Sequence, residues 1–222
     1  MRDLPRRAAA EAIGTAFLVA SVVGSGIAAV ELAPGDVGVQ LLINAIVTGA
    51  ALLALITVLQ PVSAAFNPVV TLVELFAGEI GGRAATVLVA AQVAGGAVGA
   101  VLANLMFELD AVSVAATERA TPAHLLAEVV ATLGLVLLVR GCPGERVAAV
   151  VAAYITAAYW FTSSTSFANP AVTVARTLSD TFSGIAPSSV PAFVVAQVAG
   201  GLAAGVLATW LFRRPEKESA RA

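Results

Sequence analysis

The chain has 222 residues, of which 59% are hydrophobic and only 12% are charged, with a formal net charge of −2. This balance is too apolar for an ordinary soluble domain, and the net charge does not point to nucleic-acid binding. The single cysteine, Cys142, excludes a disulfide framework.

The charged residues are clustered, and six apolar stretches lie between the clusters. They cover residues 12–30, 37–73, 84–107, 122–139, 147–175 and 181–212, with Glu128 as the interruption of the fourth. A bilayer core about 30 Å thick needs roughly 20 apolar residues in a helix, so each stretch predicts a membrane-spanning helix. The first stretch leads straight into more apolar sequence, and we expect it to be retained rather than cleaved as a signal peptide. Because the connections are short, residues 1–222 are expected to form a single transmembrane channel domain.

The basic residues predict the orientation of these spans. With six spans, both termini lie on one side, which then holds Arg2, Arg6, Arg7, Arg83, Arg140, Arg146, Arg213, Arg214, Lys217 and Arg221. The other side keeps only Arg119 and Arg176. Basic residues are concentrated on the cytoplasmic side of membrane proteins, so both termini are expected to be cytoplasmic.

Two of the apolar stretches, 37–73 and 147–175, are too long for one span and too short for two. Each contains an Asn-Pro pair followed by a small or branched apolar residue: Asn67-Pro68-Val69 and Asn169-Pro170-Ala171. Asparagine is a good N-cap and proline fits the first helical position, so each pair predicts the start of a short helix. Residues 68–76 as a helix would be about 14 Å long, half of a bilayer. A loop and a half-helix are allowed at this depth only when buried in protein or lining a wet cavity, which indicates a transport pathway.

The two halves of the chain repeat one another. Residues 91–107 and 196–212 are identical at 10 of 17 positions, and the blocks around the Asn-Pro pairs and around Glu11 and Glu128 also match in the same order. Repeat one covers about 8–107 and repeat two about 122–212. Three spans per repeat is an odd number, so the second copy is inverted in the membrane, an arrangement that places a site at the midplane.

These features together resemble the aquaporin and glycerol-facilitator family along residues 11–212. The residues that carry the resemblance are Ala10-Glu11, Gly14-Thr15, Pro61-Val62-Ser63, Phe66-Asn67-Pro68-Val69, Glu128, Asn169-Pro170-Ala171 and the two Ala-Gln-Val-Ala-Gly blocks. The resemblance implies an all-α membrane protein with six transmembrane helices and two half-helices, in an aquaporin-like right-handed bundle. It also implies a homotetramer in the bilayer with one pore per subunit, for water and small neutral solutes, without a cofactor. No nucleophile–base pair or metal cluster points to an enzyme.

In such a fold the two half-helices meet at the membrane centre, and their positive dipole ends oppose the passage of cations. The amides of Asn67 and Asn169 donate hydrogen bonds into the pore. The resemblance implies that Glu11 and Glu128 face inward and accept hydrogen bonds from the backbone of the half-helix loops. A proton relay is the competing role for these two intramembrane carboxylates.

Selectivity is where this sequence departs from the family pattern. The family places an arginine three residues after the second Asn, and here that position is Val172. The other expected filter positions are Ala157, Ser166, and either Val47 or Thr48. Such a ring predicts a wide, apolar filter without arginine. Val69 replaces the usual Ala and is expected to narrow the pore centre slightly.

Arg176 follows Val172 by four residues on the same helix face. We expect it at the outer mouth or in the adjoining loop, with Asp180 as its candidate partner; reaching back to the filter is the alternative. The segment 167–182 resembles a bacterial subgroup linked to arsenic resistance, which makes arsenous acid and related metalloid hydroxides candidate solutes beside water and glycerol. It also suggests a bacterial inner membrane as the location.

Two other functions fit parts of this pattern. An ion-coupled secondary transporter also uses inverted repeats and broken helices, but it would need carboxylates at the substrate site. A structural junction protein of the same fold would show little flux.

Overall fold

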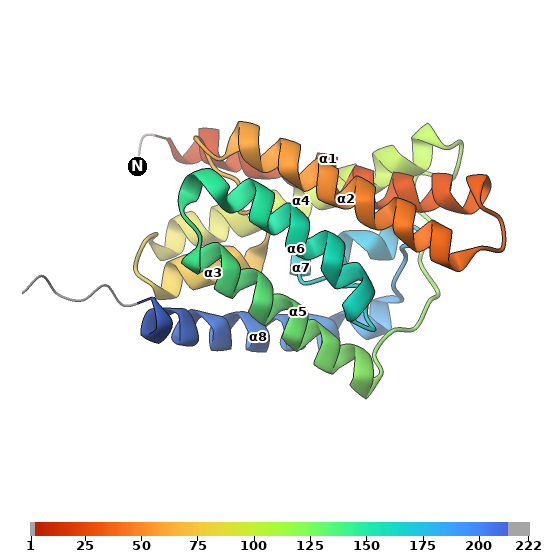
Figure 1. The fold of residues 1–222 in the computed structure, drawn as a ribbon. Coiled ribbons are helices and arrows are strands. Elements are labelled where there is room, and N and C mark those ends of the chain that lie inside the picture. The colour runs from red at the N-terminus through yellow and green to blue at the C-terminus, as the bar shows by residue number, and fades with distance from the viewer. Residues whose placement is uncertain (1–2, 213–222) are drawn as a thin grey trace, which may run out of the picture.

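The computed structural model describes residues 3–212, which form eight α-helices and three short 3-10 turns (Figure 1). The helices are α1 (Leu4–Leu32), α2 (Val37–Leu59), α3 (Pro68–Phe76), α4 (Gly82–Met106), α5 (Pro122–Gly141), α6 (Val147–Phe161), α7 (Pro170–Ala175) and α8 (Val190–Leu211). The 3-10 turns are η1 (Gly144–Arg146), η2 (Arg176–Leu178) and η3 (Pro187–Ser189). Five basic residues used to predict the orientation lie outside the described residues: Arg2, Arg213, Arg214, Lys217 and Arg221.

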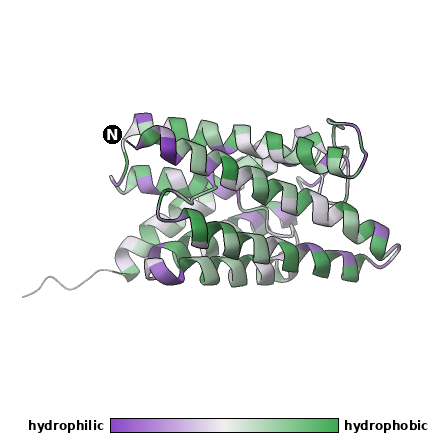
Figure 2. Ribbon diagram, turned by 90° about the horizontal axis from the view of Figure 1, so that it is seen from above, coloured by the Kyte–Doolittle hydropathy of each residue, from purple (hydrophilic) through white to green (hydrophobic). Residues whose placement is uncertain are grey.

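Five segments are long and apolar enough to cross a membrane: α1, α2, α4, α5 and Pro187–Leu211, which contains α8. The sixth expected span is α6, which has only 15 residues. Together with η1 it extends roughly 28 Å, at about 1.5 Å per α-helical and 2.0 Å per 3-10 residue. Hydrophobic residues cover most of the length of the helices (Figure 2), as expected of surfaces that face lipid.

The helices pack in the same pattern in both halves of the chain. In the first half α1 packs between α2 and α4, and in the second half α5 packs between α6 and α8, while α2 and α6 contact one another. Figure 1 shows α1 and α2 on one side and α5 and α8 on the other, with α6 and α7 between them. The start of α1 and the end of α8 lie at the same end of the bundle, which we call the terminal end.

Glycines allow the long helices to cross backbone against backbone. A Cβ atom added to Gly95 would overlap the Ala12 carbonyl, and one added to Gly200 would overlap the Val129 carbonyl. These positions are equivalent in the two repeats. Small residues have this role in membrane helix pairs because they allow close approach, so these glycines are packing sites.

The two half-helices begin as the sequence predicts. The Asn67 side chain accepts the Val69 N–H at 3.0 Å, and the Asn169 side chain accepts the Ala171 and Val172 N–H groups at 3.0 and 3.3 Å. Both asparagines have extended backbones, and a proline occupies the first turn after each. The N-caps therefore fix the starting point of α3 and α7.

Val69 packs against Gly201 of α8, and this contact gives a test of the fold. A Cβ atom on Gly201 would overlap the Val69 Cγ1 atom, whereas a Cβ atom on Gly205 would meet the Val73 Cγ1 atom at an ordinary 3.4 Å. Gly201→Ala is expected to destabilise the protein by roughly 1–3 kcal/mol, as overpacking does, and Val69→Ala should restore most of the loss.

Thermal unfolding in detergent, followed by size-exclusion chromatography, measures this effect. Gly205→Ala, one turn further along α8, is the matched control and should leave the melting temperature nearly unchanged. Equal effects of the two glycine substitutions, or no rescue by Val69→Ala, would contradict the assigned contact.

Candidate pore and its lining

A buried carboxylate on α1 holds the loop that precedes the first half-helix. Glu11 is fully buried. Its oxygens accept hydrogen bonds from Ser63 Oγ (2.5 Å), Ala65 N (2.9 Å), Phe66 N (2.6 Å) and Gln92 Nε2 (2.8 Å). Four donors converge on one ion, which offsets the free energy of burying its charge.

Glu128 on α5 has the same surroundings in the second half. Its oxygens accept hydrogen bonds from Phe167 N (3.0 Å), Ala168 N (2.8 Å) and Gln197 Nε2 (2.6 Å). These are the loop contacts that the family resemblance implied for Glu11 and Glu128. Within residues 3–212 neither carboxylate is hydrogen-bonded to another titratable side chain, so the contacts give no support to a proton relay.

The residue before each Asn-Pro pair is in a strained backbone conformation. Phe66 and Ala168 both have φ of 47°, the left-handed region that non-glycine residues rarely adopt. Each is held from both sides: its N–H is bound by a buried glutamate, and its carbonyl accepts a side-chain amide from the opposite repeat. Strain of this kind persists only where the surroundings determine the conformation, and it is a frequent mark of functional sites.

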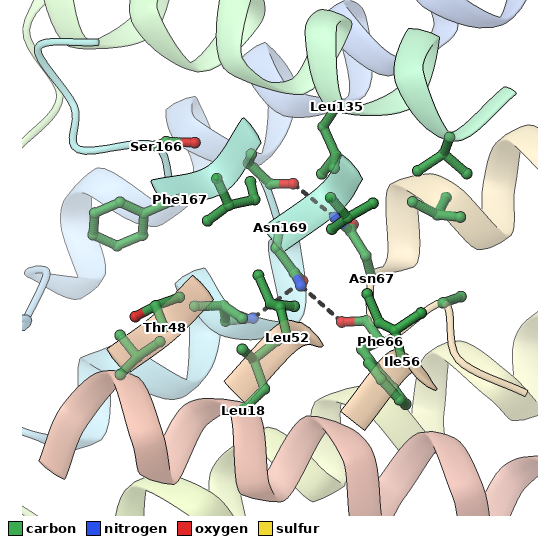
Figure 3. A pocket seen from close by; sticks show the side chains of 18 of the residues that line it. Leu18, Thr48, Leu52, Ile56, Phe66, Asn67, Leu135, Ser166, Phe167 and Asn169 are labelled. Atoms are coloured by element: carbon green, nitrogen blue, oxygen red, sulfur yellow. Dashed lines mark hydrogen bonds between the residues drawn. The ribbon is translucent and has the colours of Figure 1, made fainter. Parts of the chain in front are cut away.

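These amide contacts tie the two half-helices together at the centre of the molecule. Asn67 Nδ2 donates to the Ala168 carbonyl and Asn169 Nδ2 donates to the Phe66 carbonyl, both at 2.7 Å (Figure 3). A side-chain amide has two N–H groups. Each asparagine therefore uses its oxygen to cap its helix and one N–H to bind the opposite loop, and retains a second N–H.

A narrow cavity of about 90 Å³ runs past the two asparagines. It is lined by α1, α2, α5, α6, both half-helices and both loops, whereas the described parts of α4 and α8 take no part. Its wall near the centre is apolar, with Leu18, Leu52, Ile155 and Val172. Toward the end opposite the termini, which we call the far end, it becomes polar, with Thr48, Tyr159, Ser166 and Arg176.

The cavity decides between the two candidate positions on α2. Thr48 lines it and shares a hydrogen bond of 3.0 Å with the Tyr159 hydroxyl. Val47 is 37% exposed and borders a groove on the outside of α1, α2 and α4 instead. Successive residues of a helix point about 100° apart, so only one of the two can face the pore.

The expectation for Ala157 is wrong. Ala157 is exposed on the outside of α6, and Ile155 and Tyr159 line the cavity in its place. The sequence contained a signal for this face: the apolar residues Val147, Val151, Ile155 and Tyr159 follow one another at intervals of four, and all four line the cavity. Tyr159, the last of the four, is buried.

The structure places the remaining filter candidates as follows. Ser166 and Val172 both line the cavity. Val69 does not belong to its lining among the described residues. The expected narrowing by Val69 is therefore wrong, because its extra methyl group packs on Gly201 behind the half-helix.

Arg176 lies deeper than the expected outer mouth. Its side chain is 3% exposed, its guanidinium carbon lies 3.5 Å from the centroid of the Phe167 ring, and its Nε donates to the Ser183 carbonyl. The expected partner Asp180 instead accepts the Ala116 N–H at 3.0 Å, and residues 3–212 contain no ion pair between Arg176 and Asp180. The absence of arginine therefore holds for position 172 but not for the cavity as a whole.

Comparisons with known proteins agree with this geometry. The profile of the family described as Major intrinsic protein matches residues 2–146. The chain is 48% identical over 215 residues to the aquaglyceroporin AqpS of Rhizobium meliloti (strain 1021), which covers 95% of this chain and 92% of the relative. Its fold is similar to the X-ray structure of the aquaglyceroporin from Plasmodium falciparum, with a TM-score of 0.70 and 19% identity over 93% of this chain and 95% of the other. The chain belongs to the major intrinsic protein family, whose aquaglyceroporins are membrane channels and not enzymes.

Proposed function

We propose that this protein is a passive channel for water and for small uncharged solutes of the size of glycerol, including metalloid hydroxides such as arsenous acid. The observation that carries the proposal is Val172 in the cavity wall, one turn into the second half-helix. A valine there leaves more width than the arginine usual in the family. The two half-helix ends supply the barrier to cations.

The filter in this proposal consists of Thr48, Ser166, Val172 and, in place of Ala157, Tyr159. Thr48, Ser166 and Tyr159 line the polar far end of the cavity, and Val172 lines the apolar wall next to it. The hydroxyl groups of the filter replace part of the hydration shell of a solute with several hydroxyls. The proposal also includes a homotetramer in a bacterial inner membrane, with both termini in the cytoplasm. The exposed apolar surfaces of α1, α2 and α4 are consistent with contact to lipid or to neighbouring subunits.

Stopped-flow swelling of proteoliposomes tests the function, with water, glycerol and arsenite at neutral pH as the permeants. Val172→Arg is expected to reduce glycerol and arsenite flux at least fivefold while water flux changes less than twofold, because the larger side chain excludes the larger solutes first. Val172→Leu is the matched control for added volume without charge, and should have a smaller effect.

Three outcomes would contradict parts of this proposal. Arsenite uptake at the rate of empty vesicles would exclude the metalloid solutes. Solute flux that saturates or responds to a proton gradient would favour a coupled transporter. Negligible flux of every permeant through correctly folded protein would favour a structural junction role.

A further inference from the structure

We propose that Arg176 is a specificity-determining residue of the pore. Its guanidinium supplies, from one turn further along the chain, a positive charge that position 172 lacks. It forms with the neighbouring hydroxyls a binding site for small uncharged solutes that carry several hydrogen-bonding groups, and it excludes cations of the same size. This inference rests on the proposed channel function and assigns one of its selective groups.

The first support is the place of Arg176 in the chain. The half-helix α7 ends at Ala175, and the chain tightens into the 3-10 turn η2, which begins at Arg176. The side chain is buried and lines the same cavity as Val172. Within the described part of the chain only its Nε has a hydrogen-bond acceptor, so both terminal nitrogens remain available to a solute.

The second support is that Arg176 is held rigidly. The Nε of Arg119 donates to the Gly184 carbonyl at 2.7 Å, and its Nη2 donates to the Phe182 carbonyl at 3.2 Å. Because Arg176 binds the carbonyl of Ser183 between them, two guanidinium groups hold three successive carbonyls. The guanidinium carbon of Arg119 also lies 5.4 Å from the Phe167 ring centroid. Arg176 is thereby fixed toward the cavity.

The third support is the set of polar groups around it. Thr48 and Tyr159 share one hydrogen bond and line the cavity with Arg176. Ser166 lines it too, and its hydroxyl is buried without a partner among the described residues. A guanidinium only donates hydrogen bonds, whereas hydroxyls both donate and accept. The group of residues therefore matches an uncharged solute with both donors and acceptors.

The charge of Arg176 is not neutralised inside the cavity. Within residues 3–212 the cavity lining contains no carboxylate, and Glu128 is fully engaged with the loop backbone and Gln197. The guanidinium adds to the positive ends of the half-helices, so a cation meets two successive barriers of the same sign. An uncharged solute meets neither.

Urea and guanidinium are the probes for this inference, because they have nearly the same size and shape and differ in charge. We expect wild-type proteoliposomes to take up urea at least tenfold faster than guanidinium, after subtraction of empty vesicles. Arg176→Gln should reduce this ratio at least tenfold. Arg176→Lys should keep the ratio but change the glycerol-to-water flux ratio at least threefold, because an ammonium lacks the planar fork of donors.

Arg140→Gln is the matched control, since Arg140 is paired with Glu79 away from the far end of the cavity, and it should leave the urea-to-guanidinium ratio unchanged. Equal uptake of urea and guanidinium by the wild type would overturn the proposal even if no variant folded. A water-conducting Arg176→Gln protein with the wild-type ratio would also overturn it. Failure of the wild type to conduct water would instead count against the channel function itself.

Discussion

Glu11→Gln is expected to lower the amount of folded protein recovered from the membrane at least tenfold. The carboxylate accepts hydrogen bonds from one hydroxyl, two backbone N–H groups and the amide of Gln92. A glutamine has only one oxygen that can accept these hydrogen bonds. Its NH₂ group would point at the remaining donors, which it cannot bind because it is itself a donor. Each buried donor left without a partner costs about 1–3 kcal/mol, and Glu11 is fully buried and does not belong to the cavity lining among the described residues. The loss would also release Phe66 from its strained conformation.

Glu79→Gln is the matched control for this substitution. Glu79 is half exposed and forms an ion pair with Arg140, with a shortest N–O distance of 2.6 Å. Exposed ion pairs contribute at most about 1 kcal/mol, so this variant should be recovered like the wild type. Membrane yield and monodispersity in size-exclusion chromatography measure both effects. Recovery of Glu11→Gln as well as Glu79→Gln, with normal water flux, would mean that the loop does not depend on the carboxylate.

Much of the fold follows from local chemistry that a sequence displays. Asn-Pro pairs begin helices for reasons of capping and backbone geometry, and the caps on α3 and α7 are present. The loop contacts of Glu11 and Glu128 were implied by the family resemblance, and they are present; a buried charge requires donors, which the loop backbones supply. The caps depend only on short segments, so the local sequence displays them.

The details of the pore wall could not be predicted in the same way. The sequence distance from Ala157 to the second Asn-Pro pair does not determine which face of α6 is inward, because the intervening loop contains left-handed residues at 165, 166 and 168. Val69 faces Gly201 because the crossing of α3 and α8 leaves space there. Both outcomes depend on how separate elements pack.

Arg176 illustrates the same limit. Its spacing from Val172 placed it correctly on the same side of the half-helix, but its depth depends on the carbonyl of Ser183 and the ring of Phe167. The first belongs to the segment after the half-helix and the second to the loop before it. Neither contact has a signature in the local sequence, so the pairing with Asp180 was the simpler expectation.

Asn169→Asp is expected to separate the two roles of the central asparagines. An aspartate oxygen still accepts the Ala171 and Val172 N–H groups, and aspartate is as good an N-cap as asparagine, so α7 should remain in place. The second oxygen would stand where Nδ2 donates to the Phe66 carbonyl at 2.7 Å, and two acceptors repel one another at this distance. We expect water flux to fall at least tenfold and cation leak to rise, because a donor is lost and a negative charge opposes the half-helix dipoles.

Asn104→Asp provides the matched control for this change. Asn104 is equally buried at the end of α4, and its Nδ2 donates to the carbonyls of Ala111 and Leu178 at 3.2 and 3.0 Å. It does not line the cavity among the described residues. Asn104→Asp should therefore lower thermal stability without changing the ratio of water to cation flux. If the two variants changed that ratio equally, the effect would come from a general loosening of the bundle. A change confined to Asn169→Asp would instead locate the ion barrier at the contact between the two half-helices.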